Sequence, residues 1–459
     1  MKVVIVGAGQ VGYNLARYLS RAEKEVVVIE ADPVKCKKLD DTFDVVVVQG
    51  SGTSPTALVQ AGLGDAALFV AVTDSDETNL MTVMMAADYL PANATKMARL
   101  RSQEYLENEE LRRKFKVDVV VNPEVVLGRK LLRILSMPGA CDVLSFEEGK
   151  VDVAAFRAKP DWPIVNRTLQ QLSRDHGHLE IMVGAILRGQ PGVLGRQKVI
   201  IPDGRTTIHE GDMVYFLTKA ESTANLALIG VMEGRPGRSV VIGGGGELSI
   251  YLAELLSKAG YTTRILIGDP EAARAAAERL SKAIVLQADP SHIEVLAEIL
   301  EEGVDTYVAA CPEEAVNVLT AALAQKLGVA RSIVITQQSA MVHLIKAIDL
   351  NIVLNPFDLA AAFVLRNIHQ LDVLEANLLA GEDAEAFEFI PPDNASIIDK
   401  PLSQANFPSG TLVAMIVRNG NVIIPRGGDA IARGDRVIVL SRRGSVPALE
   451  RLIQSGQKG

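Results

Sequence analysis

The sequence has 459 residues, a formal net charge of −9 at pH 7 and 4% aromatic residues. A chain of this length exceeds one hydrophobic core, and its many alanine, valine and leucine residues are typical of α/β proteins, so we expect two to four domains of this class. The acidic balance argues against nucleic acid as a partner and against direct attraction to anionic lipid, because both require a basic face.

The chain opens with a β-branched run over 3–6, which is followed at once by the pattern G-x-G-x-x-G and an apolar helical pattern. This order predicts a strand, a tight turn and a helix. Gly7 permits the sharp turn, Gly9 lets the backbone approach a pyrophosphate, and Gly12 lets the helix pack closely on the strand. The helix N-terminus then offers free N–H groups to phosphates, so we expect nucleotide binding here.

A second buried strand, over 25–30, ends in Glu30. This carboxylate follows the glycines by about twenty residues, where a Rossmann site hydrogen-bonds a ribose diol. A carboxylate repels a 2′-phosphate and no arginine stands beside it in the sequence, so NAD(H) is favoured over NADP(H). ATP and ADP share part of these contacts and remain further candidates.

The strand predicted over 67–72 ends in the polar loop 73–79, before a methionine-rich helix over 80–87. Ligands of open parallel sheets bind beyond the carboxyl ends of the strands, where this loop lies. Thr73 or Ser75 can cap the helix while the same helix N-terminus faces the ligand cleft. Both roles stay open.

A short strand over 96–101 carries alternate cations, so we expect Arg99 and Arg101 to point to one face. Either this face is a solvated sheet edge, or Arg99 is directed at the pyrophosphate. A sixth strand, over 117–121, and a helix over 124–135 complete the domain and lead out of it.

Residues 141–218 alternate short apolar and polar runs between turn signals, which predicts a small α+β module. After a linker at 235–237, the strand and glycine turn begin again at 239, and the small module returns near 422–440. The chain is therefore predicted to be a duplicated two-domain unit, with domains over residues 1–123, 140–224, 237–356 and 373–456.

The two copies differ where the first would hold its ligand. The second copy lacks the carboxylate, the third glycine and the cation, and the residues pair as Glu30 with Ile267, Gly12 with Leu248, and Arg99 with Val334. Loss of such groups costs on the order of a few kcal/mol, so we expect the first copy to bind much more tightly. Weak binding at Gly243–Gly246, with Asp269 as a substitute carboxylate, stays open.

Three cysteines, Cys36, Cys141 and Cys311, have neither metal-ligand nor disulfide-framework spacing, which is typical of small core residues in a reducing cytosol. No segment approaches the ~18 apolar residues that span a bilayer. The N-terminal apolar run stops at Gly7, too short for the core of a signal peptide. We therefore expect a cytoplasmic protein without a metal site.

The duplicated unit, together with several of its motifs, resembles the TrkA family of potassium uptake proteins. The motifs are the glycine turn, Gln49–Gly52, the loop Thr73–Asn79, Arg99–Ser102 and the strand that follows Gly434-Asp435. The resemblance implies two Rossmann-like RCK (or KTN) domains with doubly wound parallel sheets, each followed by a small α+β RCK C-terminal domain. It covers essentially the whole chain.

The resemblance also implies a regulatory subunit that binds NAD(H), with ATP or ADP as alternatives. Such a subunit forms a homo-oligomeric ring, expected to be tetrameric, on the inner face of the plasma membrane and gates a TrkH- or TrkG-like membrane potassium transporter. The implied nucleotide site is Gly7, Ala8, Gly9, Gln10, Val11, Glu30, Thr73, Asp74 and Arg99, which Gly12 joins through the glycine pattern. Position 30 departs from the commoner family pattern, because it holds Glu where Asp is usual.

An NAD-dependent oxidoreductase is the competing class, since hydride transfer also uses a Rossmann domain. It usually requires an acid or base beside the cofactor. None of the six histidines falls in the first nucleotide domain; they are His176, His178, His209, His292, His343 and His369. A gating sensor needs only differential binding and is favoured, whereas a structural scaffold would need neither Glu30 nor Arg99.

Overall fold

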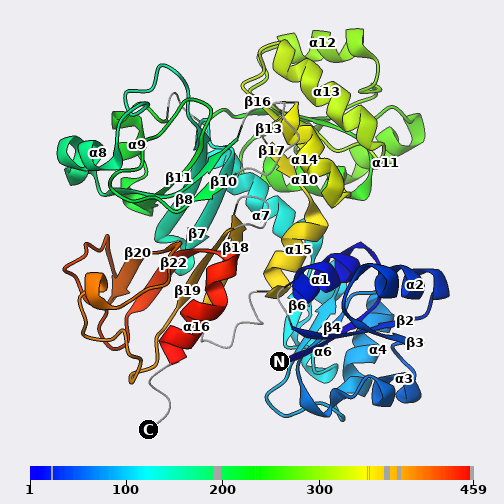
Figure 1. Cartoon of the computed structure of the whole chain (residues 1–459). Coiled ribbons are helices and arrows are strands. Elements are labelled where there is room, and N and C mark those ends of the chain that lie inside the picture. The colour runs from blue at the N-terminus through cyan, green and yellow to red at the C-terminus, as the bar shows by residue number, and fades with distance from the viewer. Residues whose placement is uncertain are drawn as a thin grey trace. The chain divides into compact units, whose positions relative to one another are not determined.

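The computed structural model describes residues 1–21, 24–189, 198–232, 234, 236–348, 350, 352–365, 373–379 and 384–454, and Figure 1 shows the helices and strands that they form. Within these residues the strands form four sheets, two with six strands and two with five. The chain divides into two compact units: unit 1 is Met1–Val126 with Pro356–His369, and unit 2 is Leu127–Asn355 with Gln370–Gly459.

Unit 1 is built on a parallel six-stranded sheet with the order β3-β2-β1-β4-β5-β6. The order reverses beside β1, which is the switch point where ligands of doubly wound sheets bind. The predicted Rossmann-like architecture is therefore confirmed. Its elements are β1 (Lys2–Val6), α1 (Gln10–Arg21), β2 (Glu25–Glu30), α2 (Pro33–Thr42), β3 (Val46–Gln49), α3 (Pro55–Gln60), β4 (Ala66–Ala71), α4 (Asp76–Ala86), β5 (Thr95–Arg99), α5 (Gln103–Glu107), α6 (Glu109–Lys114) and β6 (Val119–Val121), joined by α15 (Pro356–Leu365) from later in the chain.

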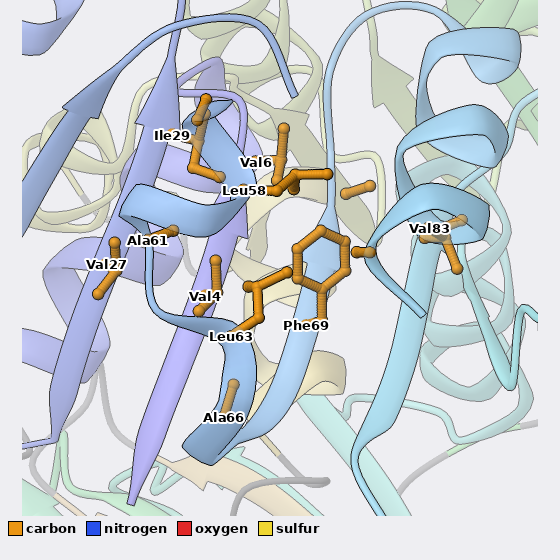
Figure 2. Packing of buried hydrophobic residues seen from close by; sticks show 14 of the residues in the cluster. Val4, Val6, Val27, Ile29, Leu58, Ala61, Leu63, Ala66, Phe69 and Val83 are labelled. Carbon is orange, nitrogen blue, oxygen red and sulfur yellow. The ribbon is translucent and has the colours of Figure 1, made fainter. Parts of the chain in front are cut away.

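The core on one face of this sheet fixes the ends of β1 and β4. Figure 2 shows the Phe69 ring at the centre of the cluster, with Leu58 and Leu63 on one side and Val83 on the other. Phe69, Leu58 and Val83 are fully buried, and burying a side chain of this size stabilises the fold by ~2–3 kcal/mol. The glycine turn after β1 and the polar loop after β4 therefore follow strands that are held in the packed core.

Unit 2 contains a second parallel six-stranded sheet, with the order β14-β13-β12-β15-β16-β17, which repeats the topology of the first. The predicted duplication of the Rossmann-like domain is confirmed by this match. Its elements are β12 (Ser239–Gly243), α10 (Glu247–Lys258), β13 (Thr262–Leu266), α11 (Pro270–Arg279), β14 (Ile284–Leu286), α12 (Ile293–Glu301), β15 (Thr306–Ala309), α13 (Glu314–Lys326), β16 (Arg331–Ile335), α14 (Ser339–Ala347) and β17 (Ile352–Leu354), and α7 (Pro123–Ser136), most of which lies in unit 2, precedes them in the chain.

Unit 2 also holds two small five-stranded sheets, whose described strands pair antiparallel in the orders β10-β9-β11-β8-β7 and β18-β19-β22-β20-β21. With their short helices they are the predicted small α+β modules. Their elements are β7 (Asp142–Phe146), β8 (Val151–Arg157), α8 (Leu169–His176), β9 (Ile181–Arg188), β10 (Lys198–Ile200), β11 (Met213–Lys219), α9 (Asn225–Leu228), β18 (Val373–Leu379), β19 (Ala384–Phe389), β20 (Thr411–Arg418), β21 (Asn421–Ile423), β22 (Arg436–Arg442) and α16 (Val446–Gln454).

The two small domains share one hydrophobic core, to which Leu217 contributes from the first and Leu440 from the second. Their sheets meet at Gly184, where a Cβ atom would lie 2.2 Å from a Leu217 methyl carbon and 2.8 Å from a Leu440 methyl carbon. A larger residue at this position would force the sheets apart.

Two buried carboxylates lie where the small domains meet. The Glu388 Oε2 atom accepts a hydrogen bond from the Glu147 backbone N–H at 2.9 Å, and the Arg436 guanidinium lies 2.6 Å from the Glu147 carboxylate and 3.7 Å from that of Glu388. Burial raises the pKa of Glu388 to about 7. Burial acts in the same direction on Glu147, but hydrogen bonds with Glu388 and Arg436 outweigh it and lower the pKa of Glu147.

The helix that follows each Rossmann-like sheet packs on the other copy. In unit 1, α15 lies against α1, and the Arg17 Nη2 and Asp358 Oδ1 atoms are 3.2 Å apart. In unit 2, α7 packs on α10, because a Cβ atom at Gly128 would lie 2.5 Å from a Leu255 methyl carbon. Helical periodicity does not indicate this exchange, since it shows only that a face is apolar and not what covers it.

Candidate functional site

The glycine turn of unit 1 has the geometry that the sequence predicts. Gly7 has a φ of +97°, which only glycine adopts readily, and a Cβ atom there would lie 3.0 Å from the Thr73 backbone nitrogen. A Cβ atom at Gly12 would lie 1.9 Å from the Gly7 carbonyl oxygen. By contrast, a Cβ atom at Gly9 would meet only one Asp74 oxygen, at 4.0 Å. The turn therefore leaves open space above Gly9, beside the N-terminus of α1, where Gln10 and Val11 begin the helix.

Glu30 lies at the end of β2 beside this turn and is only 9% exposed. Its Oε2 atom accepts a hydrogen bond from the Ala8 N–H at 2.5 Å, and its Oε1 atom accepts one from the Asp32 N–H at 2.9 Å. The carboxylate is thus held at the carboxyl edge of the sheet by backbone donors. A ribose diol bound at this edge would donate its hydroxyl groups to the Glu30 carboxylate, in place of one or both backbone N–H donors.

Asn79 organises the loop after β4, a role that the sequence does not indicate. Its buried Oδ1 atom accepts from the Thr73 N–H at 2.8 Å and from the Thr73 hydroxyl at 2.7 Å. Its Nδ2 atom donates to the carbonyl oxygens of Thr73, at 3.2 Å, and of Arg99, at 2.8 Å. One amide therefore ties the ends of β4 and β5 together. The one available signal is a polar residue on the buried face of α4.

Ser75, rather than Thr73, caps α4. The Ser75 Oγ atom accepts from the Thr78 N–H at 3.1 Å, and the helix begins at Asp76, four residues before the predicted start at Leu80. The hydroxyl of Thr73 is held by Asn79. Of the two capping residues proposed from the sequence, Ser75 is therefore the correct one, because its side chain reaches the first turn of the helix.

Arg99 is buried, and its described ion pair is with an exposed carboxylate. Its side chain is 6% exposed, whereas Asp74, whose Oδ1 atom lies 3.3 Å from Arg99 Nη1, is 79% exposed. Among the described residues, the Arg99 Nε atom has no hydrogen-bond partner. Burial, and then the nearby Arg101, lower the pKa of Arg99. A buried guanidinium with unused donors favours an additional anion at this position.

The strand predicted over 96–101 ends earlier, at Arg99, although the guanidinium groups of Arg99 and Arg101 both reach Asp74. β5 ends at Arg99 and lies between β4 and β6 in the sheet, so Arg99 does not stand on a solvated edge. Arg101 is exposed beyond the strand, where its guanidinium donates to the Asp74 carbonyl oxygen. Its backbone N–H donates to the buried Asp76 carboxylate at 2.9 Å, which turns the chain away from the strand direction.

The second copy keeps the scaffold of this edge without its charged groups. Asn317 repeats the contacts of Asn79, because its Oδ1 atom accepts from the Cys311 N–H at 2.6 Å and its Nδ2 atom donates to the Ile335 carbonyl oxygen at 3.1 Å. The Ile267 side chain takes the position of Glu30 beside the turn, and its Cγ2 atom would lie 2.7 Å from a Cβ atom at Gly245.

Two of the residue pairs expected between the copies are off by one position. Gly7 and Gly244 both have positive φ and donate to the ends of equivalent strands, so Gly12 corresponds to Ser249 and not to Leu248. The contacts of Asn79 and Asn317 likewise pair Arg99 with Ile335 and not with Val334. The expected losses of the third glycine and of the cation still hold. Asp269 caps α11 as Asp32 caps α2, so it corresponds to Asp32 rather than to Glu30.

The remaining expectations concern cysteines, metals and the membrane. Cys36 is buried, and burial raises the pKa of Cys311 to about 11, which keeps that thiol neutral. In the part of the chain that the structure describes, no group of three or more His, Cys, Asp or Glu side chains could hold a metal ion. Among the same residues, no helix is both long enough and apolar enough to cross a bilayer.

Comparison with known proteins adds relatives that match along the whole chain. The TrkA-N domain model matches residues 3–123 and 240–356, and the TrkA-C domain model matches residues 153–229 and 386–454. The chain is 30% identical over 460 residues to the Trk system potassium uptake protein TrkA of Azorhizobium caulinodans and 31% identical over 464 residues to that of Halomonas elongata; each alignment covers 99% of both chains.

Solved structures show the same fold. The GsuK channel bound to NAD has a TM-score of 0.62 and 16% identity, over 99% of this chain and 79% of that chain. The crystal structure of the GsuK RCK domain has a TM-score of 0.60 and 15% identity, over 99% and 95% of the two chains.

Proposed function

Because the chain belongs to the TrkA family, with its two domain types matched twice, we propose that it is the NAD(H)-binding regulatory subunit of a Trk-type potassium uptake system. In this proposal the first Rossmann-like domain binds the nucleotide, and the bound nucleotide changes the activity of a membrane-embedded potassium transporter. The relatives named as Trk system potassium uptake proteins support the system, and the NAD-bound GsuK channel supports the class of ligand.

The main support for the nucleotide site is the buried guanidinium of Arg99, which lies at the same sheet edge as the open glycine turn. Arg99 has an unpartnered Nε atom among the described residues and one contact to an exposed carboxylate. A pyrophosphate near Gly9 would supply the missing acceptors, with the N-terminus of α1 adding further N–H donors. The proposed contacts are Gly7, Ala8, Gly9, Gln10, Val11, Gly12, Glu30, Thr73, Asp74 and Arg99.

Glu30 gives the proposal its preference for NAD(H) over NADP(H). The carboxylate accepts two backbone N–H groups and has no arginine among its described hydrogen-bond partners. A 2′-phosphate placed here would meet a negative charge without compensation, which disfavours NADP(H). ADP and ATP carry the same adenosine and part of the same phosphate chain. They are therefore proposed as competitors for this site.

The route from the nucleotide to the rest of the protein begins at α15. This helix comes from the second copy but packs on α1, whose N-terminus borders the glycine turn. Phe357 on α15 lies against the Arg99 guanidinium, 6.0 Å from ring centroid to guanidinium carbon. Phosphates that engage Arg99 act on this contact. If one arrangement of the domains binds nucleotide a hundredfold better, the coupling free energy is ~2.7 kcal/mol, enough to shift a balanced equilibrium.

The proposal places the protein on the inner face of the plasma membrane, held there by its transporter partner of the TrkH or TrkG type. Its assembly is proposed to be a homotetrameric ring, through which several nucleotide sites act on one transporter. The role requires no catalysis of its own. In a spectrophotometric assay, NADH should remain unoxidised by the purified protein over hours.

The experiment that tests the nucleotide site is calorimetry with NADH on the full chain and on Arg99→Glu. We expect the charge reversal to weaken NADH binding at least a hundredfold, about 2.7 kcal/mol. The matched control is Arg113→Glu, whose side chain is 78% exposed on α6 of the same domain and should bind like the wild type. Wild-type affinity in Arg99→Glu would contradict the site.

The regulatory part of the proposal is tested separately, by potassium uptake in cells that express the chain with its membrane partner. Arg99→Glu should remove the dependence of uptake on nucleotide, whereas Arg113→Glu should keep it. Nucleotide-dependent uptake that survives the loss of NADH binding would contradict the gating role even if the binding site is correct.

A further inference from the structure

The nucleotide edge of unit 1 continues beyond the glycine turn, to the carboxyl ends of β4, β5 and β6. The strand order places β2, which carries Glu30, on one side of β1 and these three strands on the other side. A dinucleotide lies across such a switch point, with one nucleoside on each side of it. With the adenosine at Glu30, the second nucleoside lies beyond β4 and β5.

Glu124 lies at this second side of the edge, in the first turn of the helix that follows β6. β6 ends at Val121, whose partner in the register of the sheet is Arg99, and Glu124 is the second residue of α7. The Asn122 Nδ2 atom donates to the Leu100 carbonyl oxygen at 2.8 Å, which ties the ends of the two strands together. The fold therefore brings Glu124 to the same edge as Arg99.

The carboxylate of Glu124 contains a buried acceptor without a donor. Its Oε2 atom is shielded from solvent and has no hydrogen-bond partner among the described residues, although the side chain as a whole is only partly buried. A buried polar atom without a partner costs roughly 1–3 kcal/mol, and a charged one costs more. Such atoms are uncommon in folded proteins, which indicates that a donor belongs beside Glu124.

The neighbouring polar side chains are already engaged with the protein. The Thr73 hydroxyl donates to the Asn79 Oδ1 atom at 2.7 Å. The Asn122 Oδ1 atom accepts from the Val125 N–H at 2.9 Å, while its amide nitrogen is used between the strand ends. Glu124 therefore differs from these neighbours in keeping a buried oxygen that a ligand can fill.

The charge of Glu124 acts on Arg99 without forming an ion pair with it. Burial and Arg101 lower the pKa of Arg99, whereas carboxylates nearby raise it, and Glu124 does so more than Asp74. The described ion pair of Arg99 is nevertheless with Asp74, at 3.3 Å. A ligand between the two groups would meet an acceptor at Glu124 and the unpartnered Nε donor at Arg99. A phosphate next to a hydroxyl-bearing sugar offers this combination.

We propose that Glu124 recognises the second ribose of a dinucleotide, whose hydroxyl groups donate to its carboxylate. This inference rests on the proposed nucleotide site in unit 1 and deepens it, because the edge then holds one carboxylate for each ribose, Glu30 and Glu124. ADP has only the first ribose and makes no use of Glu124. ATP brings its terminal phosphate towards Glu124, where like charges repel. Glu124 therefore selects NADH against ATP.

Calorimetry on the full chain with NADH, ADP-ribose, ADP and ATP tests this role. ADP-ribose keeps the second ribose but lacks the nicotinamide ring. We expect Glu124→Gln to weaken the binding of NADH and of ADP-ribose at least fivefold, to leave ADP within twofold of the wild type and to strengthen ATP at least threefold. Because the affinities for NADH and ATP change in opposite directions, a folding defect cannot produce this result.

Glu110→Gln is the matched control. Glu110 is also the second residue of its helix, α6, but its side chain is 80% exposed, so its replacement should leave all four affinities unchanged. The inference is overturned if Glu124→Gln binds NADH like the wild type or if ADP loses as much affinity as NADH. It is also overturned if NADH alone is weakened and ADP-ribose is not, since the contact would then be to the nicotinamide.

These results are distinguishable from a failure of the proposed function. A wild-type protein that binds ADP and NADH, with both affinities unchanged in Glu124→Gln, keeps the nucleotide site and contradicts only the role of Glu124. A wild-type protein that binds none of the four probes contradicts the nucleotide site itself, and the role of Glu124 with it.

Discussion

The guanidinium carbon of Arg99 lies 6.0 Å from the centroid of the Phe357 ring, although the two residues come from different copies of the duplicated unit. The same helix, α15, pairs Asp358 with Arg17 on α1 at 3.2 Å. The candidate nucleotide edge of the first copy is therefore bordered by the helix that leaves the second. Duplication within one chain keeps this partner helix in place, so a ligand at Arg99 would act on a contact between the copies.

Phe357→Leu should weaken the response of α15 to NADH while leaving NADH binding within about threefold of the wild type. Leucine keeps most of the apolar contact but loses the aromatic face, which contributes ~0.5–2 kcal/mol beside a cation. Hydrogen exchange of residues 356–365, measured with and without NADH, reports the response. Equal NADH-dependent protection in both proteins would show that Phe357 has no part in the coupling.

Gly12→Ala and Gly9→Ala should separate the structural glycine from the ligand-facing one. A methyl group at position 12 would lie 1.9 Å from the Gly7 carbonyl oxygen, so we expect a loss of at least about 2 kcal/mol in the free energy of unfolding. At position 9 the nearest atom is 4.0 Å away, so stability should change by less than about 1 kcal/mol. Thermal unfolding checks both variants.

The same Gly9→Ala variant should bind NADH at least tenfold more weakly, because the methyl group occupies the proposed approach of the pyrophosphate. Calorimetry measures this affinity. Unchanged affinity in a folded Gly9→Ala protein would move the phosphates away from this turn.

Glu30→Gln should reduce the preference for NADH over NADPH by about tenfold. The amide keeps an acceptor for a ribose hydroxyl but no longer repels a 2′-phosphate, a difference of ~1.4 kcal/mol. Competition binding with the two cofactors gives the ratio. Glu25→Gln, at the exposed start of the same strand, is the control and should leave the ratio unchanged. A preference that survives in Glu30→Gln would assign cofactor selection to other residues.

The carboxylate pair between the small domains predicts a pH-dependent stability. The pKa of Glu388 is raised to about 7, so the folded state binds this proton more tightly than the unfolded state does. The contribution of Glu388 to the free energy of unfolding is therefore full below about pH 4.5 and is lost as pH rises towards 7. The lowered pKa of Glu147 acts in the opposite sense and only below the ordinary glutamate pKa of 4.5. The two effects therefore occupy different pH ranges.

Chemical denaturation at pH 5 and pH 8 checks this effect. Between these values the wild type should lose ~1–2 kcal/mol more than Glu388→Gln, whose amide cannot ionise. The same change in the free energy of unfolding between pH 5 and pH 8 in both proteins would show that Glu388 does not titrate in this range.

The local features of the nucleotide edge could be predicted from the sequence. The β-branched run before the glycines gave the strand, and the positions of Gly7, Gly12 and Glu30 follow from short-range geometry at the ends of two neighbouring strands. The role of Asn79 could not be predicted in this way. Its amide joins Thr73 to Arg99, beyond the ends of two different strands, and a buried polar residue in a helix gives no sign of its partners.

Residue correspondence between the copies was less predictable than the duplication itself. Gly243–Gly246 can be aligned with a G-x-G pattern in more than one register, and the apolar run around Val334 contains no charged residue to fix its position. Ser249 is selected by the backbone hydrogen bond of Gly244, and Ile335 by the hydrogen bond from the Asn317 side chain. The end of β5 was mispredicted for a related reason: strand alternation continues to Arg101 in the sequence, but the Asp76 carboxylate accepts the backbone N–H of Arg101, beyond the end of the strand.

The most direct test of the account is an experimental structure of the full chain with NADH. The account predicts one coenzyme per chain, with its pyrophosphate beside Gly9 and Arg99 and its adenosine ribose at Glu30. Coenzyme bound beside Gly246 and Ile267 in the second copy, with the first copy unoccupied, would contradict it.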